Sequence, residues 1–359
     1  MAEKTRLLIL FGGVSSEHEI SRASAASVLE HIDKGKYEIT TVGITREGRW
    51  LATKADSSAI ADGSWEKADG NIKVTLATDG SRMLLAEREA RNLSPMTQVD
   101  VMFPVLHGKN GEDGTVQGLA QIAGVPYVGS DATSSAACMD KSITKAMVDM
   151  AGGVNQAKCC IVHRLGCNVT QAAETIENFF EGELPLFVKP ASAGSSVGIT
   201  KVKSWGQITE ALEIAFAEDG KALVEEAITG REIECAVLGN DEPEASCLGE
   251  IHAANEFYDY EAKYEDATSM TSIVTGLDEA KENEIRDTAL RIYQIMGCRG
   301  MARVDFFLMP NGKVVFNEIN TIPGFTKISM YPQMWEASGL GYSQLIDELI
   351  RLALEDKTV

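Results

Sequence analysis

Residues 303–320 read RVDFFLMPNGKVVFNEIN, which is two β-rich runs on either side of an Asn-Gly pair. Asn-Gly between such runs is a strong short-range signal for a hairpin with a two-residue turn. Counting outward from that turn places Asp305 opposite Glu318. The next facing pair on the same side of the ladder is Arg303 with Asn320. Because side chains alternate between the two faces of a strand, these four share one face.

Two carboxylates that face each other across a hairpin repel, and a bound cation relieves the repulsion. Mg²⁺ prefers oxygen ligands and holds substrate phosphates at the same time. The pattern therefore favours a metal site made by Asp305, Glu318 and Asn320, with Arg303 beside it to hold an anion. The alternative is the solvated polar end of an ordinary hairpin.

Composition sets the broad class of the protein. A chain of 359 residues with 44% hydrophobic and 24% charged residues is typical of a globular protein with two or three domains. The net charge of −20 argues against nucleic-acid binding, which needs a basic face. Seven cysteines without a C-x-x-C pair indicate reduced thiols in a cytoplasmic protein. The apolar run at 7–11 is too short for a signal peptide or a membrane span.

Strand-like and helix-like segments alternate along the chain, which predicts an α/β or α+β fold with several layers. Residues 7–11, 16–31 and 37–44 predict a βαβ opening, whereas residues 50–98 are weakly patterned and look like an insert. A long polar loop is expected at 255–276. Further strands are expected at 99–106, 158–163, 186–189, 222–226 and 233–238, and further helices at 115–123, 142–151, 171–180, 205–217, 279–296 and 342–354.

A Gly12-Gly13 turn leads into the first helix and offers backbone N–H groups and the positive end of the helix dipole. The spacing does not match G-x-G-x-x-G, so the pattern is weak evidence for a dinucleotide site. Glu17 follows in the first helical turn. It either receives a substrate ammonium or complements the dipole.

Two later segments have the residue types that bind phosphate and adenosine. The loop after Lys189 carries Ser195 and Ser196 between glycines, and such a loop can wrap triphosphate oxygens with backbone donors and hydroxyls. It lacks the P-loop consensus and could be an ordinary flexible loop. Glu225 and Glu226 end a hydrophobic strand. They either accept hydrogen bonds from adenine and ribose or form a solvated strand end.

Two more loops have both a functional and a structural interpretation. Residues 257–264 read FYDYEAKY, which is unusually aromatic and suits a lid that closes over a reaction, or a packed surface loop. His107 lies in a glycine-rich loop, where a lone histidine is more often structural than catalytic.

Six ordered motifs give the chain a resemblance to the D-alanine–D-alanine ligases of the ATP-grasp superfamily. They are GGVSSEHEIS at 12–21, LHGKNGEDGT at 106–115, CMDK at 138–141, VKP at 188–190 with GSSVG at 194–198, YDYEAKY at 258–264, and RVD at 303–305 with NEINTIPG at 317–324. The resemblance runs nearly end to end and weakens across 50–98. It implies a Rossmann-like substrate domain at 1–129, a central ATP-grasp lobe at 130–228 and a C-terminal lobe with the metal and substrate sites at 229–359.

The resemblance also implies a role for each matching residue. ATP would be bound by Lys141, Lys189, Ser196, Val197, Glu225, Glu226, Ile228 and Glu232. Two Mg²⁺ or Mn²⁺ ions would be held by Asp305, Glu318 and Asn320. The amino-acid substrates would be contacted by Glu17, His107, Arg303, Ser329 and Met330. The catalytic set would be Glu17, Ser195, Lys263, Tyr264, Arg303 and Gly324.

The implied reaction makes D-alanyl-D-alanine for peptidoglycan in a cytoplasmic homodimer. The carboxylate of one D-alanine attacks the γ-phosphate of ATP, and the amine of a second D-alanine attacks the resulting acyl phosphate. Arg303 and the backbone N–H of Gly324 would hold the oxyanion. Ser195 and Tyr264 would link to Glu17 and close the lid, which keeps water from the acyl phosphate.

The chain departs from the family pattern at residues 327–330, which read KISM where many relatives have Ser-His, and in the lid after Tyr264. Residues 329–332 resemble the form found in Gram-positive bacteria. The alternatives are a D-serine or D-lactate ligase of the vancomycin-resistance type, and an inactive protein that binds nucleotide and D-alanine. Tyr264 argues against D-lactate and Met330 against D-serine. An inactive protein would be expected to lack a metal ligand or phosphate lysine, and each is present.

Overall fold

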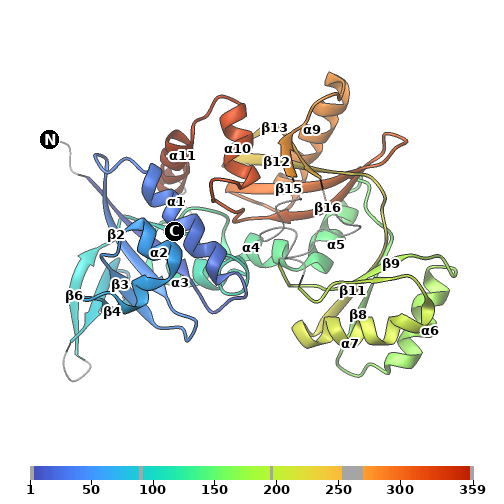
Figure 1. Cartoon of the computed structure of the whole chain (residues 1–359), viewed down its shortest axis with the longest axis horizontal. Coiled ribbons are helices and arrows are strands. Elements are labelled where there is room, and N and C mark those ends of the chain that lie inside the picture. The colour runs from blue at the N-terminus through green and yellow to red at the C-terminus, as the bar shows by residue number, and fades with distance from the viewer. Residues whose placement is uncertain (1–3, 89–91, 195–196, 253–269, 356–359) are drawn as a thin grey trace.

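The computed structural model describes residues 4–88, 92–194, 197–252 and 270–355. Within these ranges the chain forms a seven-stranded, a four-stranded and a five-stranded β-sheet. Figure 1 shows the seven-stranded sheet at one end of the molecule and the four-stranded sheet at the other, with the five-stranded sheet between them. The predicted α/β fold with several layers is therefore confirmed. Across the same ranges, every helix is too short or too polar to cross a membrane.

The N-terminal sheet has the strand order β6-β5-β4-β3-β2-β1-β7, and β1 lies parallel to both neighbours. In β1, Leu7, Ile9 and Phe11 face one core with α1, while Leu8 and Leu10 face a second core with α3. Burial on both faces explains why β1 is a continuous apolar run. The elements are β1 (Thr5–Gly12), α1 (His18–His31), β2 (Tyr37–Ile44), β3 (Trp50–Thr53), α2 (Ser57–Asp62), β4 (Ile72–Leu76), β5 (Met83–Glu87), β6 (Leu93–Gln98), β7 (Val101–Pro104) and α3 (Thr115–Ala123), with a 3-10 turn at Ser64–Lys67.

Residues 50–98, which the sequence suggested to be an insert, extend this sheet by four antiparallel strands. The strands are four to six residues long, and β6 lies at the sheet edge with most of its residues exposed. The alternation of β4, which reads IKVTL, and the Asp79-Gly80 pair after it were signals for a hairpin that the expectation of an insert did not use. Trp65 anchors the segment by packing edge-on against Phe11, with ring centroids 4.8 Å apart.

The central lobe is an antiparallel sheet in the order β10-β9-β11-β8. Val188 and Val224 face α6 and α7 in a core of their own. Side chains alternate along a strand, so Lys189 and Glu225 lie on the opposite face of the sheet. The elements are β8 (Cys159–His163), α6 (Val169–Phe179), β9 (Leu186–Pro190), β10 (Thr200–Val202), a 3-10 turn (Trp205–Gln207), α7 (Ile208–Glu218) and β11 (Lys221–Glu226).

The C-terminal sheet has the order β14-β13-β12-β15-β16, and all its strand pairs are antiparallel. Cys235 and Val304 face α9, which leaves Glu234, Arg303 and Asp305 on the other face. The remaining elements are α4 (Ala132–Met139), α5 (Lys141–Ala151), β12 (Arg231–Gly239), β13 (Glu244–His252), β14 (Met270–Ile273), α9 (Glu279–Ile295), β15 (Gly300–Leu308), β16 (Val314–Asn320), α10 (Met330–Ala337) and α11 (Tyr342–Glu355).

Two loop expectations were wrong in detail. The expected polar loop at 255–276 contains β14, which pairs with β13; residues 255–269 lie outside the described ranges. The hairpin turn has three residues instead of two, because Met309 N–H bonds to Lys313 O at 3.0 Å. Gly312 N–H bonds back to Met309 O at 2.9 Å, which is a type I turn with Pro310 at its second position.

The pairing predicted for the hairpin is nevertheless confirmed. Leu308 faces Val314, one position away from the predicted register, but a bulge between Asp305 and Phe306 restores it. Asp305 therefore lies opposite Glu318, and Arg303 lies opposite Asn320. The three-residue turn shifts the register by one residue and the bulge shifts it back. The predicted pairing was therefore correct although the predicted turn was not.

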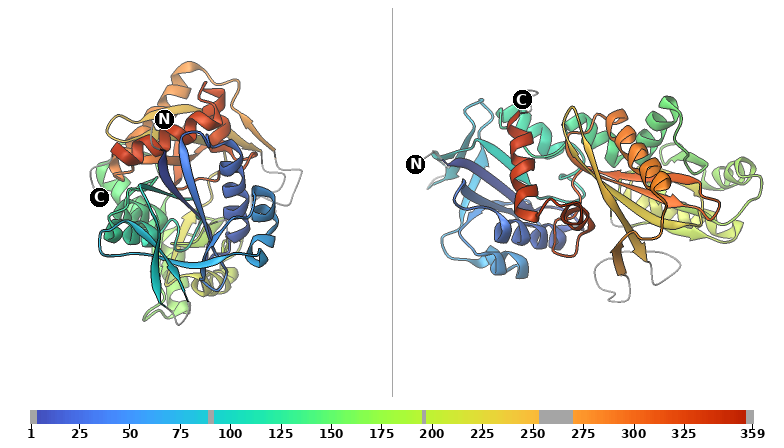
Figure 2. Two further views of the ribbon diagram at one scale, coloured as in Figure 1. Left: turned by 90° about the vertical axis from the view of Figure 1, so that its left-hand side faces the viewer. Right: turned by 90° about the horizontal axis from the view of Figure 1, so that it is seen from above.

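The C-terminal helix joins the two ends of the chain into one core. Leu345, Ile346 and Leu349 of α11 pack in the same cluster as Ile9 of β1 and Met301 of β15. Figure 2 shows α11 standing between the N-terminal sheet and the C-terminal lobe. The N-terminal and C-terminal sheets are thus fixed relative to each other by a shared apolar core, whereas the central lobe has a separate one.

Candidate active site

The hairpin and the adjacent strand β12 build a row of acids around one arginine. Glu234 lies opposite Asp305 on one side, and Glu318 lies opposite it on the other. The Arg303 guanidinium donates to Asp305 from Nε at 2.8 Å and from Nη2 at 2.7 Å, and Nε is 3.0 Å from Glu234 Oε1. Asn320 Nδ2 donates to Asp305 Oδ2 at 3.2 Å. We call these five residues the polar face.

Charge pairing explains why the half-buried Arg303 is stable here. Burial alone would lower the pKa of Arg303, but the carboxylates of Asp305 and Glu234 outweigh it and raise that pKa further. The guanidinium is therefore a fixed positive charge in a defined orientation. Sequence analysis placed four members of the polar face correctly and missed Glu234, although a single acid on the otherwise apolar strand 233–238 was a signal for it.

Lysines from two other elements approach this row. Lys141, the first residue of α5, lies with Nζ 3.3 Å from Glu318 Oε2 and donates to the carbonyl of Ala193 at 3.0 Å. Lys189 at the end of β9 contacts the Glu225 carboxylate. The structure thus brings both lysines predicted to bind phosphate to the space between the central and C-terminal sheets.

Glu225 and Glu226 have different surroundings. The Glu225 carboxylate is buried between Lys189 and Lys145, whose Nζ is 2.7 Å from Glu225 Oε1. Burial would raise the pKa of Glu225, but the two lysines lower it, so it is held as a carboxylate. Glu226 Oε1 accepts from the backbone N–H of Lys158 at 2.8 Å. No sequence pattern pointed to Lys145, because it lies on an amphipathic helix as many surface lysines do.

Three other residues predicted to bind ATP lie on or next to β12, β11 and the loop after β9. Glu232 is on β12, two residues before Glu234 and therefore on the same side of the strand. Ile228 is half-buried just after β11, and Val197 N–H bonds to Gly194 O at 3.2 Å. Ser195, Ser196, Lys263 and Tyr264 lie outside the described residues, so their predicted roles stay predictions.

Glu17 lies where three loops meet. It is buried just before α1, and its Oε2 sits so close to two glycines that a Cβ on Gly108 would be 2.5 Å away and a Cβ on Gly194 2.6 Å away. Gly108 belongs to the loop after β7, and Gly194 to the loop after β9. Gly108, which also has a φ of +68°, therefore requires glycine, and a side chain at Gly194 would have to displace the Glu17 carboxylate. The carboxylate lies between a loop of the N-terminal sheet and a loop of the central lobe.

The Gly12-Gly13 turn does not offer free N–H groups, contrary to expectation. Gly12 N–H donates to Ser21 Oγ at 2.8 Å, and Gly13 N–H donates to the Ile44 carbonyl at 2.8 Å. Gly12 is required instead for packing, because a Cβ there would lie 2.3 Å from the carbonyl oxygen of Ile44. The turn serves to position Glu17 and carries no anion site of its own.

His107, beside Glu17, connects α1 to the loop after β16 by hydrogen bonds. Its Nδ1 bonds to the Ile322 carbonyl at 3.1 Å, so Nδ1 carries the proton, and its Nε2 accepts from Ser24 Oγ at 3.0 Å. Burial lowers the pKa of His107, while Glu17 opposes that change. Both ring nitrogens are thus occupied by protein groups, and the neutral ring fixes the loop at 321–325 against α1.

Glu112 is a second acid near Glu17 that sequence analysis did not single out. It accepts a hydrogen bond from the backbone N–H of Gly108 at 2.6 Å. Burial and the neighbouring charge of Glu17 raise the pKa of Glu112 to about 8. Glu112 therefore keeps its proton at pH 7, and it lies beside Glu17 at this end of the site. The signal was available in the motif HGKNGEDG.

The loop that follows β16 closes the far side of the site. A Cβ on Gly324 would lie 2.8 Å from Ser329 Oγ, and that hydroxyl accepts from Thr326 N–H at 3.0 Å. Met330, predicted to contact substrate, is buried in the core at the start of α10. A Cβ on Gly249 would come within 2.4 Å of the Met330 methyl group. Met330 is therefore a core residue in this structure, and its burial does not fit the predicted contact with substrate.

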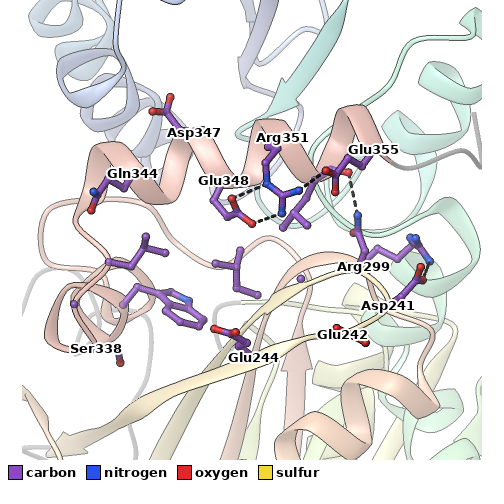
Figure 3. A pocket seen from close by; sticks show the side chains of 17 residues that line it. Asp241, Glu242, Glu244, Arg299, Ser338, Gln344, Asp347, Glu348, Arg351 and Glu355 are labelled. Atoms are coloured by element: carbon purple, nitrogen blue, oxygen red, sulfur yellow. Dashed lines mark hydrogen bonds and ion pairs between the residues drawn. The ribbon is translucent and has the colours of Figure 1, made fainter.

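A groove of about 1070 Å³ lies elsewhere, between the β12–β13 turn, the end of α10 and α11 (Figure 3). It is lined by ion pairs such as Arg299–Asp241, with 3.2 Å between Nη1 and Oδ1. Arg351 also reaches toward Glu348 and Glu355 there, as the dashed lines show. Its lining includes no residue of the polar face and neither phosphate lysine, so it is separate from the candidate active site.

Comparisons with known proteins agree along the whole chain. A model described as the D-ala D-ala ligase N-terminus matches residues 6–130, and one described as the D-ala D-ala ligase C-terminus matches residues 149–351. The chain is 46% identical to D-alanine–D-alanine ligase B of Clostridium tetani, with 99% of this chain and 95% of that protein covered. It is 46% identical to D-alanine–D-alanine ligase A of Escherichia coli K12, with 98% and 96% covered.

Solved structures give the same result. The D-alanine–D-alanine ligase of Coxiella burnetii superposes with a TM-score of 0.86 at 38% identity, covering 99% of this chain and 95% of that one. The VanG D-Ala:D-Ser ligase of Enterococcus faecalis superposes with a TM-score of 0.87 at 39% identity, covering 98% and 100%. The family models and the relatives together cover nearly the whole chain, so the chain is a member of the D-alanine–D-alanine ligase family.

Proposed function

We propose that the protein joins two D-alanines into D-alanyl-D-alanine with ATP as co-substrate, in support of peptidoglycan synthesis. The names of the relatives support this activity. The observation that carries it here is the contact between Lys141 and Glu318, at 3.3 Å, because it brings a phosphate-binding cation and a metal-binding acid to one point. Lys141 belongs to the motif at 138–141 and Glu318 to the motif at 317–324, so the contact joins two of the six motifs.

The polar face suits Mg²⁺ bound together with ATP. In the described part of the chain, no group of three or more His, Cys, Asp or Glu is arranged to hold a metal ion alone. Mg²⁺ in nucleotide sites needs only one or two carboxylates, because phosphates and water supply the other ligands. Asp305, Glu318 and Asn320 fit that requirement, and they would hold one or two ions. The ions would neutralise charge on the phosphates.

The residues of the chain bind and orient the reactants. Glu17 receives the ammonium of the first D-alanine, and Lys141 and Lys189 neutralise the phosphates of ATP. Phosphoryl transfer depends mainly on such positioning and electrostatic stabilisation. The first carboxylate attacks the γ-phosphorus, ADP leaves, and an acyl phosphate is formed. The role of Lys263 on the transferring phosphate stays a prediction from the family motif.

The second half of the reaction forms the peptide bond. The amine of the second D-alanine attacks the acyl carbonyl, and phosphate leaves. Arg303, fixed by Asp305 and Glu234, is held as a permanent cation for the oxyanion, and the backbone N–H of Gly324 is its proposed partner. Ser329 would contact the second D-alanine, with Met330 packed behind it. Ser195 and Tyr264 would close the lid against water.

The same proposal includes three properties of the whole protein. The chain divides into domains at residues 1–129, 130–228 and 229–359, which correspond to the three sheets. It acts in the cytoplasm, where its seven thiols would stay reduced. It works as a homodimer, as the family resemblance implies.

The competing function is a ligase that uses D-serine as the second substrate, and the likeness to VanG favours testing it. The enzyme is given ATP, Mg²⁺ and an equimolar mixture of D-alanine, D-serine and D-lactate, and products are identified by mass. We expect D-alanyl-D-alanine to dominate. Dominant D-alanyl-D-serine would replace the proposed specificity, and ATP binding without any ligated product would indicate a binding protein.

A further inference from the structure

Lys145 is a buried lysine to which no role has been given so far. Its side chain is only 5% exposed, and its partner Glu225 is also 5% exposed. Lys145 Nζ lies 2.7 Å from Glu225 Oε1, while Lys189, 6% exposed, contacts Oε2 of the same carboxylate. One acid thus sits between two lysines contributed by α5 and β9.

The lysines that should bind phosphate are already engaged with acids in this structure. Lys189 contacts Glu225, and Lys141 lies 3.3 Å from Glu318. A lysine that turns to a phosphate must weaken its bond to such an acid. In the proposed site, a Mg²⁺ ion held by Glu318 would replace Lys141 as the partner of that carboxylate. Glu225 has no metal ion to replace Lys189.

Leaving Glu225 without a cation would be costly. A buried carboxylate that loses its only partner carries an uncompensated charge, which is strongly destabilising. Lys145 prevents this, because it contacts the other oxygen of the same carboxylate. Lys141 and Lys145 are four residues apart on α5 and therefore lie on the same side of the helix. Helix α5 thus provides a lysine partner for each of the two acids, Glu318 and Glu225.

We propose that Lys145 is a positioning residue that keeps Glu225 paired while Lys189 turns to the phosphates of ATP. This rests on the proposed function, because it takes ATP as the ligand and Lys189 as its phosphate lysine. Lys145 itself touches neither substrate. Its presence lets Glu225 remain ionised and oriented toward the adenosine, so it controls ATP binding and not the binding of D-alanine.

The test compares four variants of the full-length enzyme by steady-state kinetics and by calorimetric titration with ADP. In Lys145→Met, Lys189 is the one ion-pair partner left to Glu225 within residues 4–88, 92–194, 197–252 and 270–355. We expect the KM for ATP and the Kd for ADP to rise at least tenfold, with the KM values for D-alanine within twofold of wild type. Lys145→Arg keeps the charge and should stay within threefold. Lys54→Met removes an exposed lysine just after β3 and should change nothing.

The double variant Lys145→Met/Glu225→Gln separates this role from simple structural support. It removes the buried charge as well as its partner, so Lys189 is released to the phosphates. We expect ADP to bind at least threefold more tightly than to Lys145→Met. A merely structural lysine would also destabilise the ligand-free enzyme, whereas we expect urea unfolding of ligand-free Lys145→Met to stay close to wild type, because Lys189 still pairs with Glu225 there. If Lys145→Met fails to fold, Lys145→Gln replaces it in each comparison, because the amide is polar but uncharged.

Three results would overturn the inference: ATP and ADP parameters within twofold of wild type in Lys145→Met, equal losses for ATP and D-alanine, or no rescue in the double variant. Failure of the proposed function is distinguishable from these. It would appear as wild-type enzyme without D-alanine-dependent ATP turnover, whatever the variants show.

Discussion

At the residue scale, the site depends on how its cationic side chains are paired with its carboxylates. Arg303, Lys141 and Lys189 each meet a carboxylate, so the described site is a set of paired charges before any substrate is bound. Sequence reasoning could name most of these residues because motifs fix their spacing. It could not name Lys145, because its partner Glu225 comes from a distant segment of the chain. Glu234 and Glu112 each had a signal in the sequence, but the motifs did not select them.

Glu17→Gln tests the ammonium site. Loss of the charge should weaken binding of the first D-alanine by about 1.5–3 kcal/mol, which corresponds to a KM roughly ten- to hundredfold higher. The KM for ATP should change little. Glu19→Gln is the matched control, because Glu19 lies on the same helix but pairs with Arg46 at the surface. Equal kinetics for Glu17→Gln and wild type would remove Glu17 from the site.

Gly194→Ala tests the junction around Glu17. The added Cβ would lie 2.6 Å from Glu17 Oε2 and should displace the carboxylate, so the KM for D-alanine should rise at least tenfold. The control is Gly118→Ala in α3, where the Cβ meets open space. That change should leave activity intact and stabilise the fold by about 0.5–1 kcal/mol. Wild-type kinetics for Gly194→Ala would show that the junction is not as tight as described.

Glu112→Gln tests the unusual proton affinity of that residue. Its folded pKa of about 8 exceeds the ordinary value of 4.5, so the folded protein keeps a proton that the unfolded chain loses between these values. Wild-type stability should therefore fall as pH rises from about 4.5 to 8 because of this group. The variant lacks this loss, so its stability relative to wild type should increase by about 1 kcal/mol or more between pH 5 and pH 8.5. Urea unfolding at both pH values measures it, and a constant difference would contradict the assignment.

At the element scale, the β15–β16 hairpin carries the chemistry. The alternation of its strands was readable from the sequence, and so was the facing of Asp305 and Glu318. The type I turn and the bulge were not readable, because a residue pair such as Asn-Gly fits more than one loop length. The choice was made by Pro310, which suits the second position of a type I turn.

Asp305→Asn tests the hairpin. The amide keeps the shape of the side chain but loses the charge, so turnover should fall by at least a hundredfold. Arg303 retains Glu234 as a partner, so the free energy of unfolding should fall by only about 1–3 kcal/mol. Activity and urea unfolding are measured on the same preparation. If the variant unfolds at room temperature, the polar face is primarily structural.

At the scale of the whole molecule, the last helix, α11, packs against the first strand, β1. Helix α11 packs against the N-terminal sheet and the C-terminal lobe, and the central lobe keeps a core of its own. The alternation of elements predicted the individual lobes. The alternation could not predict that α11 packs against β1. Amphipathicity shows that one face of a helix is buried, but it does not show which element covers that face.

Leu349→Ala tests that shared core. Leu349 is fully buried between the two sheets, and its truncation should cost about 2–5 kcal/mol. Leu354→Ala, on the exposed side of the same helix, should cost less than about 1 kcal/mol. Calorimetry should show the loss in the transition that includes both terminal sheets. A loss of equal size in both variants would show that α11 is not a core element.

The central claim is that one site couples ATP cleavage to the joining of two D-alanines. The most direct measurement is phosphate release from ATP and Mg²⁺ with D-alanine as the only amino acid, with the dipeptide quantified by mass in the same sample. The account predicts one D-alanyl-D-alanine for each phosphate released and no release without D-alanine. Phosphate release without dipeptide, or no release in the presence of D-alanine, would contradict it.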